Sequence, residues 1–307
     1  MIRRTKGLET GQVHAISIGE VLWDVIGPAE HLGGAPFNFA LHLRNLGHSV
    51  DFISAVGNDE RGRRVLTRMR EAGLSTAYVA QLSGRATGTA SVLLDAHGQP
   101  RFVINHPAAY DFPRLLEEEA ERLCSDNPQL IYFGTLFQMS PPAREVTLKV
   151  LRKCPAARRF YDVNLRADSY TPDLVYDLMS RATVVKVNED EVGTIRSMFL
   201  EPAVSLEQFC RDYARKFGWE AVCVTCGAAG CVLLMDGTLV TSPGYSVPVV
   251  DTIGAGDAFA AGLAHGLTAG WNPDRVADFA NRLGALVATR HGATPAWRVE
   301  EATALRH

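Results

Sequence analysis

The residues best suited to chemistry lie together in one nonapeptide, Asp251-Thr252-Ile253-Gly254-Ala255-Gly256-Asp257-Ala258-Phe259. Its three small residues, 254 to 256, let backbone N–H groups approach an anion, and the helical pattern that follows would direct its positive dipole end to the same point. A carboxylate, Asp257, stands where the anion would lie. Because an acid repels a resting phosphate but can take a proton from an attacking hydroxyl, the segment favours phosphoryl transfer over simple phosphate binding.

Two other phosphate-binding loops fit this segment less well. The sequence Gly-Lys-Ser/Thr occurs nowhere in the chain, which excludes a lysine P-loop. A dinucleotide fingerprint is weak, because Phe259 occupies the place of the third glycine and the segment lies near the carboxyl end of the chain. An anion hole with a base is the interpretation that remains.

Composition narrows the class of partner. The chain has 307 residues, enough to bury a substantial core in one large α/β domain or in a domain with a smaller appendage. A net charge of −3 gives no electrostatic reason to expect nucleic acid or an anionic membrane. No run of about 18 uncharged apolar residues could span a bilayer. We therefore expect small-molecule ligands.

The ends and the cysteines indicate a cytoplasmic protein. Residues 1–12 are basic and polar and lack the apolar core of a secretory signal, so we expect a flexible N-terminal arm. Of the six cysteines, Cys223 and Cys226 form a lone CxxC pair, but positions three apart in a buried strand point to opposite faces. We expect unpaired core cysteines in a reducing compartment.

Short apolar runs alternate with helical periodicity along most of the chain. This alternation predicts a mainly parallel sheet covered by helices on both faces, with ligands beyond the carboxyl ends of the strands. Glycine ends two of the helical patterns. The clearest strand patterns are 15–18, 50–56, 130–133, 160–163, 184–187 and 221–224, and the clearest helical patterns are 36–46, 61–72 and 142–151.

Two regions break the alternation. Residues 89–95 and 101–105 predict a hairpin around His97-Gly98-Gln99, and residues 21–32 lack a helical pattern before the Gly33-Gly34 turn. If both project from one edge, they form a small β lid that excludes water from phosphoryl transfer. The alternative is two unrelated surface hairpins. We expect one domain over 13–307, with lid segments at about 21–34 and 86–107.

Four segments in order resemble the ribokinase-like, PfkB-type carbohydrate kinases over about residues 20–295. The nonapeptide is similar to the second signature of that family, which is the most specific of the four. The other three resemble its sugar-binding Gly-Gly-x-x-x-Asn segment, its Gly-x-Asp-x-x-Gly turn and its Asn-x-x-Glu motif. They are Gly33-Gly34-Ala35-Pro36-Phe37-Asn38, Gly57-Asn58-Asp59-Glu60-Arg61-Gly62 and Asn188-Glu189-Asp190-Glu191.

The resemblance implies a three-layer αβα sandwich with a β lid, acting as an ATP-dependent sugar kinase. Asp257 would be the general base for the sugar hydroxyl, rather than a helix-capping aspartate. The amides of Gly254, Ala255 and Gly256 would form an anion hole for the transferred phosphoryl group.

A magnesium ion would accompany the ATP. The resemblance implies that Glu191 organises Mg²⁺ through water while Asn188 faces the phosphates. A lone glutamate is chemically adequate because Mg²⁺ keeps several of its waters. The alternative for Glu191 is a solvated acid in a first helical turn.

The resemblance also places the two substrates and a monovalent cation. Asp24, Gly33, Gly34 and Asn38 would hold the sugar, although Asn38 could be a satisfied polar residue within a helix. Thr225, Gly227, Gly230 and Asn281 would line the nucleotide site, although Asn281 could be an ordinary exposed helix residue. Asp251 and the loop from Val287 to Gly292 resemble the place where many relatives bind a monovalent cation such as K⁺.

Substrate choice depends on Asp162-Val163-Asn164-Leu165-Arg166, which resembles a segment of fructokinases and 2-keto-3-deoxygluconate kinases. Arg166 would offer a forked donor to sugar oxygens or to phosphate, and its alternative is a surface arginine. Gly134-Thr135-Leu136-Phe137-Gln138 also resembles the fructokinase branch, whereas Met139 and Tyr170 depart from it. We expect fructose first, and ribose, a nucleoside or 2-keto-3-deoxygluconate as alternatives. A sugar sensor without activity is the non-enzyme alternative, and relatives suggest a homodimer through the lid.

Overall fold

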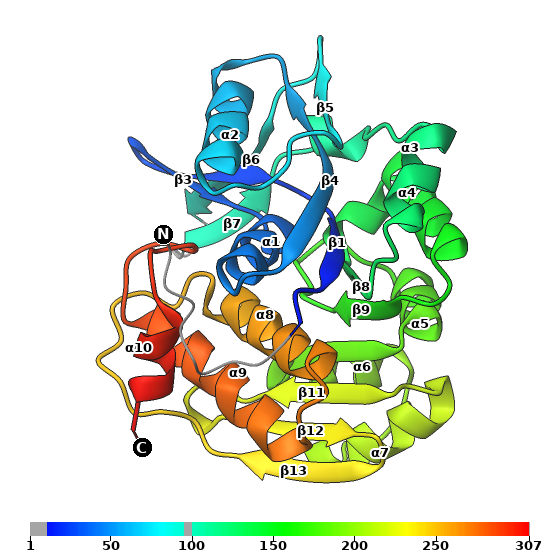
Figure 1. Cartoon of the computed structure of the whole chain (residues 1–307), viewed down its shortest axis with the longest axis vertical. Helices are drawn as coiled ribbons and strands as arrows, with labels where there is room; N and C mark the ends of the chain where they lie inside the picture. Colours follow the sequence, from blue (N-terminus) through cyan, green and yellow to red (C-terminus); the bar gives the residue numbers. More distant parts are fainter. Residues whose placement is uncertain (1–10, 95–99, 307) are drawn as a thin grey trace.

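The computed structural model describes residues 11–94 and 100–306 (Figure 1). The N-terminal arm expected at 1–12 therefore falls almost wholly outside the described residues, and so does the turn expected at His97-Gly98-Gln99. None of the helices in those described ranges combines the length and the apolar character that a bilayer span requires.

A nine-stranded sheet forms the centre of the molecule, in the order β13-β12-β11-β10-β9-β8-β1-β4-β5. The seven strands from β11 to β5 in that order run parallel, and β12 and β13 add an antiparallel edge. This confirms the mainly parallel sheet that the sequence predicts. The strands are β1 (His14–Ile18), β4 (Ser49–Gly57), β5 (Val79–Leu82), β8 (Leu130–Gly134), β9 (Arg158–Asp162), β10 (Val184–Asn188), β11 (Ala221–Thr225), β12 (Cys231–Met235) and β13 (Thr238–Ser242).

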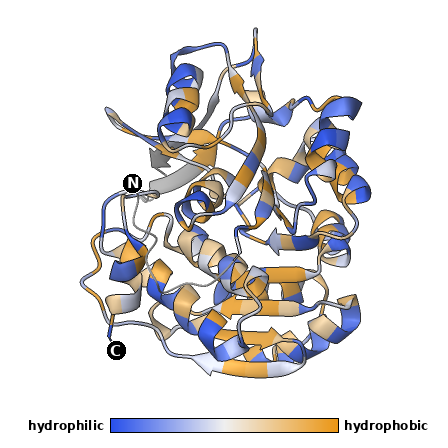
Figure 2. Ribbon diagram, in the orientation of Figure 1, coloured by the Kyte–Doolittle hydropathy of each residue, from blue (hydrophilic) through white to orange (hydrophobic). Residues whose placement is uncertain are grey.

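Helices cover both faces of this sheet, which explains why its strands read as apolar runs rather than as alternating patterns. Neighbouring strand residues belong to different apolar layers: Ala15 and Tyr132 to one, Ile16 and Phe133 to the other. Figure 2 shows the sheet as the most hydrophobic part of the fold. The first layer holds α1 (Ala35–Asn45), α2 (Glu60–Glu71), α8 (Ala255–Thr268), α9 (Pro273–Ala288) and α10 (Val299–Ala304), and the second α3 (Glu117–Ser125), α4 (Pro141–Lys153), α5 (Pro172–Arg181), α6 (Glu189–Met198) and α7 (Leu206–Phe217).

A separate four-stranded sheet forms the lid, and it joins the two segments that the sequence singled out. Its order is β3-β2-β6-β7, with β2 (Leu22–Ile26) and β6 (Gly88–Leu94) parallel at the centre, and β3 (Ala29–Gly33) and β7 (Pro100–Ile104) outside. The two regions are therefore one lid and not unrelated hairpins. Where lid side chains are described, Ile26 is the large apolar residue that is exposed. Dimerisation through the lid stays a prediction.

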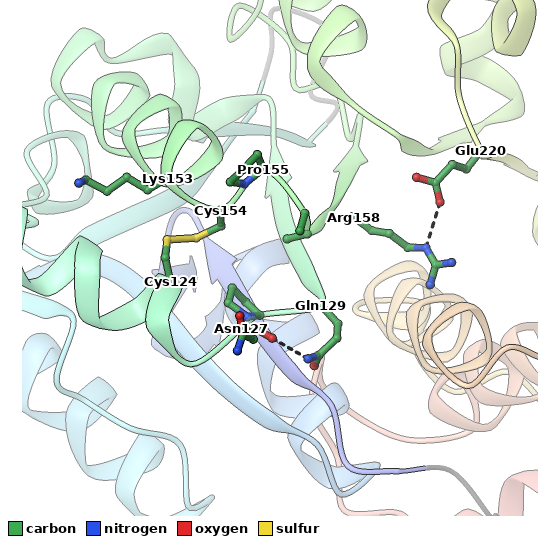
Figure 3. Close-up of a pocket in the computed structure, with 11 residues that line it drawn as sticks. Cys124, Asn127, Gln129, Lys153, Cys154, Pro155, Arg158 and Glu220 are labelled. Carbon is green, nitrogen blue, oxygen red and sulfur yellow. Dashed lines mark hydrogen bonds and ion pairs between the residues drawn. A yellow bond between two sulfur atoms is a disulfide. The ribbon is translucent and has the colours of Figure 1, made fainter.

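The expectation of unpaired cysteines is wrong for Cys124 and Cys154, which form a disulfide across 30 residues (Figure 3). Cys124 lies in the last turn of α3 and Cys154 directly follows α4, so the packing of these two helices brings the sulfurs together. A spacing of 30 residues carries no sequence signal for such a pair. The adjoining cavity, of about 550 Å³, lies beside Gln129 and Arg158 at the amino ends of β8 and β9.

Candidate active site

A tight turn starts α8 at the carboxyl end of the sheet. Gly254 is the N-cap and adopts a left-handed backbone, with φ 78°. A Cβ atom there would lie 2.3 Å from the Ala293 carbonyl oxygen, so glycine is required both by its backbone and by the space. The Ala255 amide donates to Thr252 O at 3.2 Å and closes the turn. First-turn amides of a helix lack intrahelical acceptors, so this turn is suited to an anion.

Asp257 lies in the first turn of α8 and is half-buried. Its Oδ2 accepts a hydrogen bond from Asn38 Nδ2 of α1 at 2.8 Å. It does not cap α8, because the N-cap is Gly254 and no side chain caps this helix. Burial raises the pKa of Asp257 to about 6, against the opposing effect of the Asn38 hydrogen bond. Such a carboxyl group is poised to accept a proton near neutral pH.

This raised pKa predicts an acid limb in the activity of the protein. Asp257 must be ionised to act as a base, so we expect kcat/KM for the sugar to fall below about pH 6 as its carboxylate becomes protonated. A pH profile from 5 to 8, with the coupling enzymes in excess and thermal unfolding followed at each pH, measures this. A profile that stays flat down to pH 5 in folded protein would contradict the role of Asp257.

Lys186 is a buried cation beside the turn. Its Nζ donates to Asp162 Oδ1 at 2.9 Å, and Asp162 Oδ2 accepts from the Tyr132 hydroxyl at 2.8 Å. A Cβ atom on Gly256 would lie 3.8 Å from Lys186 Nζ, so the ammonium group is next to the anion-binding turn. Burial alone would lower the pKa of Lys186, but the carboxylates of Asp162, Glu191 and Asp257 raise it. The lysine therefore stays charged.

Asn188 and Glu191 cap α6 reciprocally. Asn188 Oδ1 accepts from the Glu191 amide at 2.8 Å, and Glu191 Oε2 accepts from the Asn188 amide at 2.9 Å. Glu191 Oε1 accepts from the Leu165 amide at 2.7 Å. The residue is buried, so the solvated acid considered for it is wrong, and burial raises its pKa.

This donor set fits a magnesium ion held through water. Each carboxylate oxygen of Glu191 uses one lone pair on a backbone amide and keeps another for a metal-bound water. No group of three or more acidic, histidine or cysteine side chains gathers as a direct metal cage in the described part of the chain. A single acidic residue is what an ion that retains most of its waters requires.

Three of the predicted sugar residues lie where the lid joins the sheet. Asp24 lies on β2 opposite β3, where a Cβ on Gly33 would be 3.0 Å from Asp24 Oδ2. Gly34 has φ 112°, and a Cβ there would lie 2.5 Å from Glu20 O. Burial raises the pKa of Asp24, while the charge of Arg166 lowers it.

The side chain of Arg166 is exposed, yet its charge acts on three carboxyl groups of the candidate site. It lowers the pKa values of Asp24 on the lid, Asp257 on α8 and Glu20 after β1. The arginine is a surface residue whose charge acts on the candidate site, and its contact with a sugar stays a prediction.

Asp59 fixes the lid to the sheet. Its Oδ1 accepts from the Gly62 amide and from the Thr87 hydroxyl, and its Oδ2 accepts from the Thr87 amide, all within 2.6–2.8 Å. Thr87 directly precedes β6 of the lid. Burial alone would raise the pKa of Asp59, but these hydrogen bonds keep it below its ordinary value. The Gly-Asn-Asp turn thus anchors the root of the lid.

The predicted nucleotide residues gather around β11 and α9. Thr225 ends β11, and Gly227 begins the 3₁₀ turn after it. Gly230 has φ 100°, and a Cβ there would lie 2.1 Å from Ser242 O. Asn281 is buried, not exposed, and its Nδ2 donates to Ser242 and Pro243 oxygens at 3.1–3.3 Å. Asn281 therefore holds the loop after β13 against α9.

The predicted monovalent-cation residues also meet. Asp251 Oδ2 accepts from the Gly292 amide at 3.0 Å, and the Asp251 amide donates to Ala288 O at 3.2 Å. The Val287 carbonyl accepts from the Arg290 amide at 3.0 Å, which leaves one lone pair. The two segments form one backbone-rich junction next to the anion-binding turn.

Sequence reasoning missed Lys186 and Glu20. A lysine inside the apolar strand Val184–Asn188 was a usable signal, because a charged residue in a doubly covered strand needs a partner. Glu20, two residues after β1, was an acid at the carboxyl end of a central parallel strand. That is the edge at which ligands bind in such sheets.

Residues 13–299 match the family described as pfkB family carbohydrate kinase. The chain belongs to that family. A protein of Pyrococcus horikoshii named as a sugar kinase is 29% identical over 93% of each chain. Its crystal structure in complex with ATP superposes with a TM-score of 0.79 at 27% identity, covering 94% of this chain and 96% of that one.

Two further relatives show the range of named substrates within the pfkB family. A fructokinase of Escherichia coli is 30% identical, over 86% of this chain and 88% of its own. An aminoimidazole riboside kinase of Salmonella typhimurium is 29% identical, over 86% of this chain and 84% of its own. The protein is therefore a carbohydrate kinase of the pfkB family with the ribokinase-like fold.

Proposed function

We propose that the protein transfers the γ-phosphate of ATP to a primary hydroxyl of a neutral sugar, with fructose as the first candidate. The observation that carries the proposal is Asp257, a half-buried carboxylate at the start of α8, held by Asn38 and adjoining the Gly254–Gly256 turn. A base, an anion-binding turn and the predicted sugar residues share one end of the sheet. The fructokinase relative and the relative solved with ATP support this choice of substrates.

In the proposed reaction, Asp257 accepts the proton of the sugar hydroxyl as that oxygen attacks the γ-phosphorus. The amides of the turn and the ammonium group of Lys186 stabilise the charge that spreads over the phosphoryl oxygens. Asn38 keeps the Asp257 carboxylate in place. A magnesium ion bound with ATP would neutralise phosphate charge, and Glu191 would hold it through its waters while Asn188 faces the phosphates.

The remaining predicted residues complete this proposal. Asp24, Gly33, Gly34 and Arg166 contact the sugar, and Thr225, Gly227 and Gly230 line the nucleotide site beside the loop that Asn281 holds. The junction of Asp251 with Val287 and Gly292 takes a monovalent cation through carbonyl oxygens. Such an ion would stiffen the turn at Gly254, whose neighbour Ala293 lies in the same segment.

Two other substrates compete with fructose. The aminoimidazole riboside kinase relative supports a riboside, which is also neutral. The Asp162 to Arg166 segment supports 2-keto-3-deoxygluconate, a sugar acid that would replace the neutral sugar of the proposal. A sensor without activity is disfavoured, because a mere binding protein has no need of a carboxylate with a raised pKa beside an anion-binding turn.

An ADP-release assay tests the proposal across fructose, ribose, 2-keto-3-deoxygluconate, adenosine, aminoimidazole riboside and fructose 6-phosphate. We expect the highest kcat/KM with fructose and strict dependence on both sugar and ATP. A higher kcat/KM with another sugar would replace fructose as the proposed substrate and would leave the kinase activity as proposed. Failure with every sugar, in protein that binds ATP, would overturn the proposed function and favour the sensor.

A further inference from the structure

Four buried side chains near the base and the lid have polar atoms without hydrogen-bond partners. They are Glu20 Oε2, Asn38 Oδ1, the Tyr110 hydroxyl, and both Oε1 and Nε2 of Gln138. Buried polar groups in folded proteins are nearly always hydrogen-bonded, so each exception needs an explanation. Glu20 and Gln138 both follow the carboxyl ends of central strands, the edge at which polar ligands bind in such sheets.

Glu20 links three members of this group: its charge acts on Tyr110, and the charge of Asp257, the partner of Asn38, acts on Glu20. It is 5% exposed and lies between the end of β1 and the start of lid strand β2, so it stands where the lid leaves the sheet. The amide of Glu20 itself and the Ala35 amide at the start of α1 both donate to its carboxyl group, and Oε2 has no partner. The charges of Arg166 and Asp257 both act on the Glu20 carboxyl, which places it in the same field as the base.

Gln138 and Tyr110 lie on elements next to β1 and the lid. Gln138 lies in the 3₁₀ turn Leu136–Met139 that follows β8, and β8 pairs directly with β1. Tyr110 follows lid strand β7, and its ring would meet a Cβ on Gly88 of β6 at 2.5 Å. The Ser140 hydroxyl donates to Asp111 O, which ties the two short turns together. Both side chains are fully buried.

We infer that Glu20, with Gln138 and Tyr110, binds hydroxyl groups of the sugar that do not react. This deepens the proposed function and rests on it. A sugar offers several hydroxyls that each donate and accept, which matches an unpaired carboxylate oxygen, an unpaired amide and an unpaired phenol. If only the residues of the family motifs contacted the sugar, Glu20, Gln138 and Tyr110 would still lack hydrogen-bond partners when the sugar is bound.

The charges at this place favour an uncharged ligand. Asp24, Glu20 and Asp257 contribute carboxyl groups, against the guanidinium of Arg166. The other nearby cation, Lys186, is already paired with the buried carboxylate of Asp162. A sugar acid would bring a further negative charge into this group, so a neutral polyhydroxylated sugar fits it better.

The sharpest test replaces Glu20 by methionine, which fills similar space without hydrogen bonding. We expect the KM and Kd for the sugar that the wild type phosphorylates to rise about 10- to 100-fold, since a buried sugar hydroxyl loses its hydrogen-bond partner. The KM for ATP should change less than about 2-fold. Gln138→Leu should act in the same direction. Glu220→Gln is the control. It also removes a carboxyl group, but at the amino end of β11, where Glu220 pairs with Arg158, so the kinetics should not change.

Monodeoxy analogues of the sugar separate binding from a structural role. If Glu20 binds a particular hydroxyl, the analogue that lacks this hydroxyl should bind the wild type more weakly than the parent sugar does. The same analogue and the parent sugar should bind Glu20→Met equally well. Glu20 also meets the start of α1, so a purely structural role would weaken every analogue equally, and that result would overturn the inference. So would an unaltered sugar KM in folded Glu20→Met. A wild type inactive on all sugars would instead contradict the proposed function.

Discussion

Replacing Asp257 by asparagine is expected to lower turnover about 10²- to 10⁴-fold, the range for loss of a positioned base. Asparagine has the same shape but cannot accept the hydroxyl proton, so the sugar and ATP should still bind. The hydrogen bond from Asn38 can be kept, because an amide oxygen also accepts. Turnover at saturating sugar and ATP measures the loss of catalysis, and Kd values from titration calorimetry show whether both substrates still bind.

A matched control exists in the next helix. Asp274 is an exposed aspartate in the first turn of α9, so Asp274→Asn makes the same chemical change in the same helical context without touching the site. It should leave turnover unchanged. Near-normal turnover in Asp257→Asn would remove the proposed base from the mechanism, whatever sugar is used.

Loss of Lys186 is expected to have the largest effect on stability. In Lys186→Met, the buried Asp162 carboxylate keeps the Tyr132 hydroxyl but loses its cation. Breaking a buried ion pair in this way costs about 3–5 kcal/mol of unfolding free energy. Turnover should also fall, by about 10²-fold or more, because a fixed positive charge beside the anion-binding turn is gone. Urea unfolding and steady-state kinetics give the two numbers.

A double variant separates the two roles of the lysine. Asp162→Asn combined with Lys186→Met removes both buried charges, so it should recover most of the lost stability. Turnover should stay low, because no cation adjoins Gly256. Recovery of turnover together with stability would show that Lys186 serves only the fold. In the single variant the acid limb should also move to higher pH, since Lys186 lowers the pKa of Asp257.

The sheet and its main helices could be predicted because local patterns determine them. The strand pattern at 184–187 and the helical pattern at 142–151 differ from the observed elements by only one or two residues at their ends. The pairing of lid strands β2 and β6 was harder, since it joins segments more than 60 residues apart through backbone hydrogen bonds. Backbone pairing of that kind leaves little trace in side-chain types.

The site was predictable where a motif fixes a backbone, as at Gly254, and less so where function depends on a single side chain. Lys186 looks like one unusual residue in an apolar strand until β9 brings Asp162 beside it. From the sequence, the side-chain amide of Asn281 could contact either a ligand or a loop. The structure shows that it contacts the loop after β13, whose position the sequence does not reveal. The Cys124–Cys154 disulfide likewise depends on how two helices pack.

The contact between Asn38 and Asp257 has a consequence for how the protein is made. These residues are 219 positions apart, and α1 packs directly on α8. During synthesis, the amino-terminal strands and the lid segments emerge long before α8, so the side of α1 that packs on α8 has no cover in the growing chain. The proposed active site is completed only by the last two long helices. A nascent or truncated chain ending before Asp251 would hold the predicted sugar residues without the proposed base and with an exposed, aggregation-prone surface on α1.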